Sequence, residues 1–92
     1  MAKISTGTKT VTTAGTRVAL AGSGQAKALA VTAKQTNAGS IYVGDATVSS
    51  SVTPPLNPGD TITMSADDPF NLADVYLDSQ INGEAADYVA VL

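Results

Sequence analysis

The ionisable side chains of this chain restrict its chemistry before any fold is considered. The sequence contains eight carboxylates and neither histidine nor cysteine. The usual acid–base group at neutral pH and the strongest side-chain nucleophile are therefore both missing. Two carboxylates at a defined separation would suffice to hydrolyse a glycosidic bond. The acidic residues stand mainly in turn sequences, however, and the chain has no tryptophan, so we predict no catalytic residues.

A group of oxygen-bearing side chains lies between residues 67 and 74. Asp67, Asp68, Asn71 and Asp74 offer hard ligands of the kind that Ca²⁺ takes. Their spacing differs from that of an EF-hand loop, and Pro69 interrupts it. We interpret the group as a solvated acidic loop and expect neither a metal site nor a cofactor.

The basic residues do not form a nucleic-acid-binding pattern. All five lie in the first 34 residues, and no aromatic residue lies among them to stack on bases. Gly22-Ser23-Gly24-Gln25 lacks the spacing and the lysine of a phosphate-binding loop and is more typical of a flexible hairpin loop. No stretch approaches the roughly 20 apolar residues of a membrane-spanning helix. We expect neither nucleic acid nor a membrane as a partner.

Charge is segregated along the chain. Every basic residue precedes Asp45 and every acidic residue lies at or after it, so charges of +5 and −8 give the net charge of −3. One interpretation is mutual attraction between the two halves of one fold; the other is a basic amino-terminal arm that reaches an acidic surface on a neighbour. We favour the first, because surface charges need no partner.

Short stretches of alternating apolar and polar residues, closed by turn residues, run through the sequence. Such period-two patterning is typical of half-buried strands. The segment from Ala26 to Gln35 is rich in alanine, yet it alternates and is too short for a helix without caps, so we predict a strand there too. At 92 residues the chain supports one domain. The sequence therefore predicts an all-β sandwich or barrel of about seven to eight strands.

The larger members of each alternation are predicted to face inward, and Phe70 and Leu72 are predicted to cap one end of the core. The predicted core residues are Leu29, Val31, Ile41, Val43, Ile62, Met64, Val75, Leu77, Val89 and Val91.

The first ten residues are polar and contain one large apolar residue, Ile4. We predict that residues 1–10 form an extended N-terminal arm and that residues 11–92 form the β-sandwich or barrel domain. In this interpretation Lys3 and Lys9 pair with acidic groups of a partner and Ile4 fills a small apolar pocket. The alternative is a disordered start, as chain ends commonly are.

The second half of the chain resembles small virion proteins of tailed bacteriophages. The resemblance rests on Ile41-Tyr42-Val43-Gly44-Asp45, Leu56-Asn57-Pro58-Gly59-Asp60 and Val75-Tyr76-Leu77-Asp78, together with Asn82-Gly83-Glu84 and Tyr88. It implies a jelly-roll-like fold and a role as a capsid decoration, or cement, protein. It also implies assembly in the host cytoplasm, a place on the capsid surface of the virion, the major capsid protein as partner, and a homo-oligomer, either dimer or trimer.

Two other functions are considered. A tail, collar or fibre-associated virion domain would fit the same resemblance, and a carbohydrate-binding β-sandwich is the alternative from another class, although sugar platforms usually need exposed aromatic rings. The polar connection after Asp45 is the other predicted contact region. The predicted partner-binding residues are Lys3, Ile4, Lys9, Ser49, Ser50, Ser51, Pro54 and Pro55.

Overall fold

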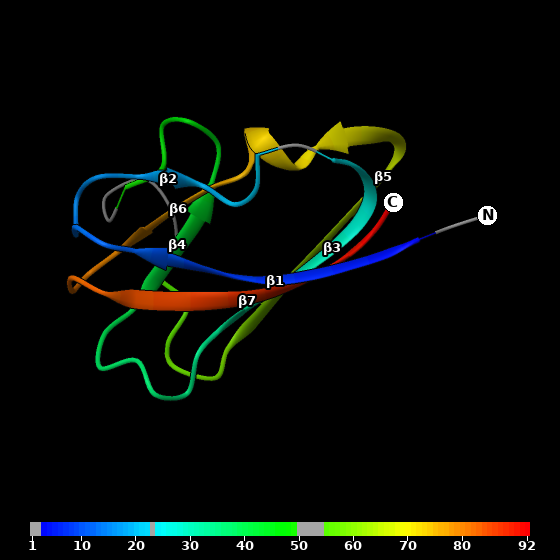
Figure 1. Ribbon diagram of the computed structural model, residues 1–92. Coiled ribbons are helices and arrows are strands. Elements are labelled where there is room, and N and C mark those ends of the chain that lie inside the picture. Colours follow the sequence, from blue (N-terminus) through cyan, green and yellow to red (C-terminus); the bar gives the residue numbers. More distant parts are fainter. Residues whose placement is uncertain (1–2, 23, 50–54) are drawn as a thin grey trace.

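The chain forms two antiparallel β-sheets that pack against each other (Figure 1). The computed structural model describes residues 3–22, 24–49 and 55–92. Within these residues, sheet A has the strand order β1-β7-β3-β5, and sheet B has the order β2-β6-β4. One 3-10 turn, η1 (Leu72–Asp74), joins β5 to β6. The strands are β1 (Ile4–Val11), β2 (Val18–Ala19), β3 (Gln25–Ala33), β4 (Ile41–Gly44), β5 (Thr61–Asn71), β6 (Tyr76–Ser79) and β7 (Glu84–Val91).

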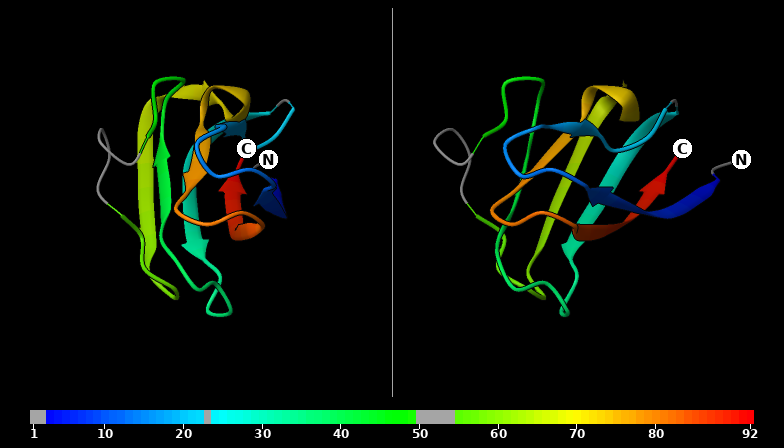
Figure 2. Two further views of the ribbon diagram at one scale, coloured as in Figure 1. Left: turned by 90° about the vertical axis from the view of Figure 1, so that its left-hand side faces the viewer. Right: turned by 60° about the vertical axis from the view of Figure 1, so that its left-hand side comes forward.

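The strand pairings are nested about the connection that follows β4. Ile41 of β4 forms a bridge with Leu56, and β3 pairs with β5, β2 with β6 and β1 with β7. The chain therefore runs out and returns antiparallel beside itself, as one long hairpin would. Two further pairings, β3 with β7 and β4 with β6, fold this ribbon into the two sheets. Figure 2 shows the resulting pair of layers.

The core lies between the sheets and uses the inward half of each alternation. Met64 and Phe70 are partly buried and pack against this core, and Leu72 is 1% exposed. Phe70 and Leu72 thus both pack with the core, Leu72 as a fully buried member of it. The predicted core residues that are buried are Leu29, Val31, Ile41, Val43, Val75 and Leu77.

The prediction for Val89 and Val91 of β7 was wrong, because both valines lie on the outward side of the strand. Val89 is 49% exposed and Val91 is half-buried, while Ala86 and Ala90 are fully buried. Ala90 stands opposite Leu29 of β3, whose side chain already occupies the interior there. A small residue therefore fits inside, and the valines are left on the other side.

Ile62 shares the inner side of sheet A with Val31 but is still 37% exposed. Its strand, β5, is at the edge of the sheet and has a neighbour on one side only among the described residues. The side chain consequently lacks packing partners on the other side, so its prediction as a core residue was only partly correct.

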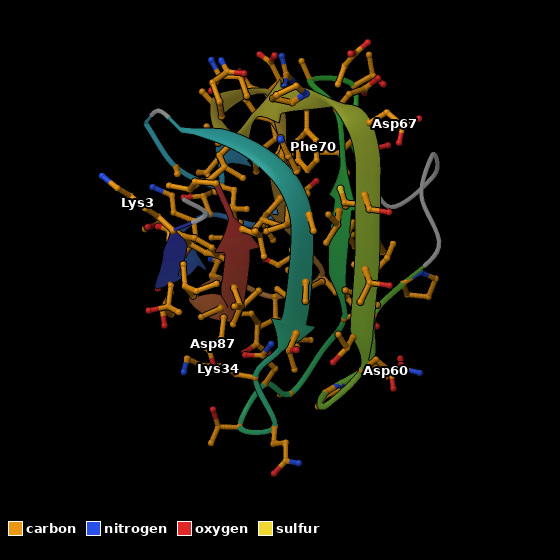
Figure 3. The ribbon with its side chains drawn as sticks, turned by 90° about the vertical axis from the view of Figure 1, so that its right-hand side faces the viewer. Lys3, Lys34, Asp60, Asp67, Phe70 and Asp87 are labelled. Carbon is orange, nitrogen blue, oxygen red and sulfur yellow. The ribbon has the colours of Figure 1, made fainter. Side chains whose placement is uncertain are left out.

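The alanine-rich segment is a strand, as predicted, and it forms β3. Its partner β5 is longer than expected, since it continues through the predicted acidic loop to Asn71. A register shift between Ala26 and Ala28 lets the pair bend without losing its pairing, and the curvature of β3 and β5 is visible in Figure 3. Pro69 is tolerated because β5 is an edge strand.

The predicted N-terminal arm is absent from the described chain. Residues 4–11 form β1, which pairs with β7 along its whole length from Ile4 opposite Val91 to Val11 opposite Glu84. The arm was predicted because this segment has little apolar character; its backbone hydrogen bonds to β7 hold it instead. The closed barrel is also wrong: the strands belong to two separate sheets.

Buried polar side chains tie the loops to the sandwich. Glu84 accepts hydrogen bonds from the backbone N–H groups of Ala38 and Gly39 at 2.6 and 2.8 Å. Asn37 bonds both the N–H and the C=O of Ala85. In the described residues, no buried polar side-chain atom lacks a hydrogen-bond partner. These groups therefore serve the fold.

Candidate binding surface

The outward side of sheet A is a surface of small side chains. Side chains that share a face of a sheet alternate along each strand and stand opposite one another across strands. The registers place Thr6 beside Val89, Val89 beside Ala30, and Ala30 beside Thr63. We call this surface the outer face. Its residues are Ile4, Thr6, Thr8, Thr10, Ala28, Ala30, Thr32, Thr61, Thr63, Ser65, Ala85, Asp87, Val89 and Val91.

A shallow hollow of about 350 Å³ lies on the apolar part of the outer face. Ala28 and Ala30 of β3 line it between Val89 and Val91 on β7 and the hydroxyl side chains on β5. Because alanine has a shorter side chain than valine, the middle of the sheet is lower than the β7 side. The hollow can accept a small protruding apolar group of a partner.

The other part of the outer face is polar and internally paired. Thr8 donates a hydrogen bond to Asp87, and the Nζ atom of Lys34 lies 2.9 and 3.1 Å from the two carboxylate oxygens of Asp87. The Thr8 hydrogen bond and the Lys34 ammonium together hold the pKa of Asp87 below its usual value. The hydroxyl oxygens of Thr32 and Thr61 are 2.7 Å apart. These side chains therefore already have partners within the chain.

The predicted partner-binding residues that the structure describes do not form one cluster. Ile4 is 66% exposed and lies on the outer face beside Val91. Lys3 is exposed next to it, but Lys9 is half-buried on the opposite side of β1. Ser49 and Pro55 belong to the connection after β4, away from the start of β1 (Figure 1). Ser50, Ser51 and Pro54 lie outside the described residues.

Asn71, from the group of oxygen-bearing side chains at residues 67–74, and Asp45 have local structural partners. Asn71 caps η1 by accepting a hydrogen bond from the N–H of Ala73. Asp45 accepts hydrogen bonds from the Thr47 hydroxyl and N–H, which lower its pKa. Among the residues that the structure describes, no group of three or more carboxylates, histidines or cysteines could hold a metal ion. Nor is any helix in them long and apolar enough to cross a membrane.

A second, polar hollow lies at the other end of the molecule. Gly15, Thr16, Arg17 and Tyr76 line it, and the Arg17 guanidinium lies 6.0 Å from the centre of the Tyr76 ring. At this distance the contact is a weak cation–π interaction. The hollow contains no other charged side chain in its lining, so its chemistry points to no particular ligand.

Comparison with known proteins finds no matching family model, no matching curated protein and no matching solved structure. One signal for the outer face was present in the sequence, because hydroxyl residues alternate at 6, 8 and 10 and again at 61, 63 and 65. The alternation alone does not show that the two runs share one face of a sheet.

Proposed function

We propose that the chain is a structural virion protein that binds the outer surface of a bacteriophage head and stabilises it. The observation that carries this proposal is the nested strand pairing. If Leu56 is counted as a reduced strand between β4 and β5, the chain has eight strand segments. In chain order, the first then pairs with the eighth, the second with the seventh, the third with the sixth and the fourth with the fifth. This order supports a jelly roll, an architecture that recurs in viral capsid proteins.

The outer face supplies a plausible contact for a head surface. It combines exposed hydroxyl groups on β1 and β5 with short aliphatic side chains on β3 and β7. Small side chains lose little rotamer entropy on burial, and hydroxyl groups can donate and accept hydrogen bonds with partner backbone. Such a surface fits a flat, preformed partner. Many copies on one head add weak contacts into firm attachment.

Heads that lack the protein provide the direct test. Purified protein is added back, and its occupancy on the heads and their resistance to heat are measured. Ala30→Arg places a long charged side chain in the hollow of the outer face and is expected to reduce occupancy strongly. Ala46→Arg makes the same change at an exposed position after β4 and is expected to bind normally.

The two variants also separate the alternatives. If Ala46→Arg rather than Ala30→Arg reduces occupancy, attachment belongs to the connection after β4 and the outer face is not the contact. If the wild-type protein binds purified tails and not heads, the role is that of a tail or collar domain. Far-UV circular dichroism establishes that both variants retain the strand spectrum of the wild-type protein.

A further inference from the structure

The edges of the two sheets differ in how they are protected. An exposed strand edge presents unpaired N–H and C=O groups, and proteins usually guard it with short length, charge, proline or a covering segment. β2 has two residues, and β4 has four residues and is bridged by Leu56. β5 carries Asp67, Asp68 and Pro69. β1 has eight residues, contains neither proline nor an acidic residue, and carries a single lysine, Lys9.

The free edge of β1 offers a regular row of backbone groups. Lys3 and Leu92 exchange both of their backbone hydrogen bonds, at 3.4 and 2.8 Å. Because paired and unpaired positions alternate along an antiparallel strand, Ser5, Gly7 and Lys9 also direct their N–H and C=O groups toward β7. The other residues of the strand direct their N–H and C=O groups away from the sheet; they are Ile4, Thr6, Thr8 and Thr10. No described residue forms a hydrogen bond with these backbone groups.

The amino-terminal half of this edge is open. Figure 1 shows it running clear of β2, β4 and β6, and Ile4, Thr6 and Thr8 are exposed. A strand of another molecule can therefore approach along it.

We propose that two copies of this chain pair through their β1 strands, antiparallel and related by a twofold axis at Gly7. In this register Thr6 lies opposite Thr8 of the partner subunit, and Lys9 lies opposite Ser5 of the partner subunit. Registers that set Lys9 against Lys3 or Lys9 of the partner subunit are disfavoured, because like charges directly opposite destabilise a strand pair. The result is one continuous eight-stranded sheet, and closed twofold pairing is the commonest assembly of identical chains.

The geometry of this pairing also explains why a second copy is the occupant. A twofold axis perpendicular to the sheet keeps both outer faces on the same side. Neighbouring strands lie about 4.8 Å apart, and each residue adds about 3.3 Å along a strand. One four-stranded outer face therefore covers only about 500 Å². A specific interface usually buries about 800 Å² per partner. Two faces side by side reach about 1,000 Å², so the dimer supplies the area that one chain lacks.

The area argument rests on the proposed attachment to a phage head, but the strand pairing is tested independently of it. The pairing is tested on the purified protein without particles, by analytical ultracentrifugation over a range of concentrations. The wild-type protein is expected to form a dimer that dissociates on dilution. A wild-type protein that stays monomeric at millimolar concentration overturns the proposal and leaves head binding to be judged separately.

Thr6→Pro is the decisive variant. Proline removes the N–H that faces the free edge and leaves the β1–β7 hydrogen bonds intact. Two backbone hydrogen bonds across the axis are lost, so the dimer should weaken about tenfold or more. Thr6→Val keeps the N–H and should leave the dimer unchanged. If Thr6→Val dissociates the dimer as Thr6→Pro does, side-chain contacts hold it and strand pairing is wrong.

Thr63→Pro is the matched control on the other edge of sheet A, because alternation directs the N–H of Thr63 away from β3. It should leave the dimer intact; dissociation would assign the interface to β5 and overturn the proposal. Amide hydrogen exchange of the wild-type protein provides a measurement that needs no variant. The Thr6 and Thr8 amides should become protected as concentration rises, and fast exchange of both in the dimer would contradict pairing through β1.

Discussion

The ring of Tyr88 in β7 lies across the backbone of Gly7 in β1. The two residues stand directly opposite each other, on the inner side of sheet A. A Cβ atom at position 7 would come within 2.8 Å of the Tyr88 hydroxyl oxygen and 2.9 Å of two ring carbons. Tyr88 is partly buried and packs against the core, which restricts how far its ring can move aside. The contact links β1 to the core without an apolar side chain on β1 at this point.

Gly7→Ala is therefore expected to destabilise the protein by about 1 to 3 kcal/mol, through overpacking against the Tyr88 ring. Urea denaturation measures the free energy of unfolding. The cost should fall when Tyr88 is replaced by Leu, because residues in contact show non-additive effects. Equal costs of Gly7→Ala in the wild-type and Tyr88→Leu proteins would show that the ring is not the obstacle.

Leu77 and Ile62 differ sharply in exposure, although both belong to the alternating pattern of the core. Leu77 is fully buried and Ile62 is 37% exposed. Leu77→Ala is expected to cost about 2 to 5 kcal/mol, the usual range for a buried leucine. Ile62→Ala should cost clearly less, because its site opens to solvent. Similar denaturation midpoints for the two variants would mean that the edge position is as tightly packed as the centre.

Asn37 joins the β3–β4 connection to β7 through two hydrogen bonds with Ala85, at 2.8 and 3.1 Å. Asn37→Ala is expected to cost about 1 to 3 kcal/mol, because it leaves the buried N–H of Ala85 without a partner; the Ala85 C=O still accepts a hydrogen bond from the N–H of Lys34. Asn82→Ala is the control: Asn82 also accepts a hydrogen bond, from the N–H of Ala14, but it is exposed. Water can replace that bond, so a cost at position 82 as large as at position 37 would refute the explanation.

Asp87 makes stability depend on pH in a defined direction. Its pKa is lowered in the folded protein, chiefly by the Thr8 hydroxyl and then by Lys34. Its stabilising contribution is therefore present above the unfolded pKa of about 3.9 and is lost as pH falls through the lower, folded value. The pair is about half exposed, with side-chain exposures of 37% and 47%, so the effect at pH 7 should not exceed about 1 kcal/mol.

Asp87→Asn is the corresponding variant. Thermal unfolding should show it less stable than the wild-type protein at pH 7, with the difference disappearing in acid. A difference that stays constant from pH 7 to pH 2 would mean that the carboxylate charge plays no part.

The sequence predicted the strand content well because alternation and turn residues act locally. Ala26 to Gln35 illustrates this, since its period-two pattern outweighed the helix propensity of alanine. The inward side of β7 could not be predicted in the same way. It depends on Leu29, which reaches the interior from the neighbouring strand and leaves room for only a small side chain at Ala90 opposite it.

The position of residues 4–11 was missed for a related reason. Backbone pairing with β7 orders this segment, and such pairing cannot be predicted from the hydrophobicity of the side chains. The candidate surface could be predicted only in part. The sequence shows that hydroxyl residues alternate on β1 and β5. The hollow between these strands arises where the registers of β3 and β7 bring alanines beside valines, and the sequence does not show those registers.

The central proposal, that the chain is a bacteriophage head protein, is tested most directly by electron cryo-microscopy of the particles in which we propose that it resides. We predict density for the sandwich on the outside of the head, repeated at symmetry-related positions, with the sheet β1-β7-β3-β5 turned toward the capsid. Density for the protein only in the tail, or on the head with this sheet facing solvent, would contradict the account.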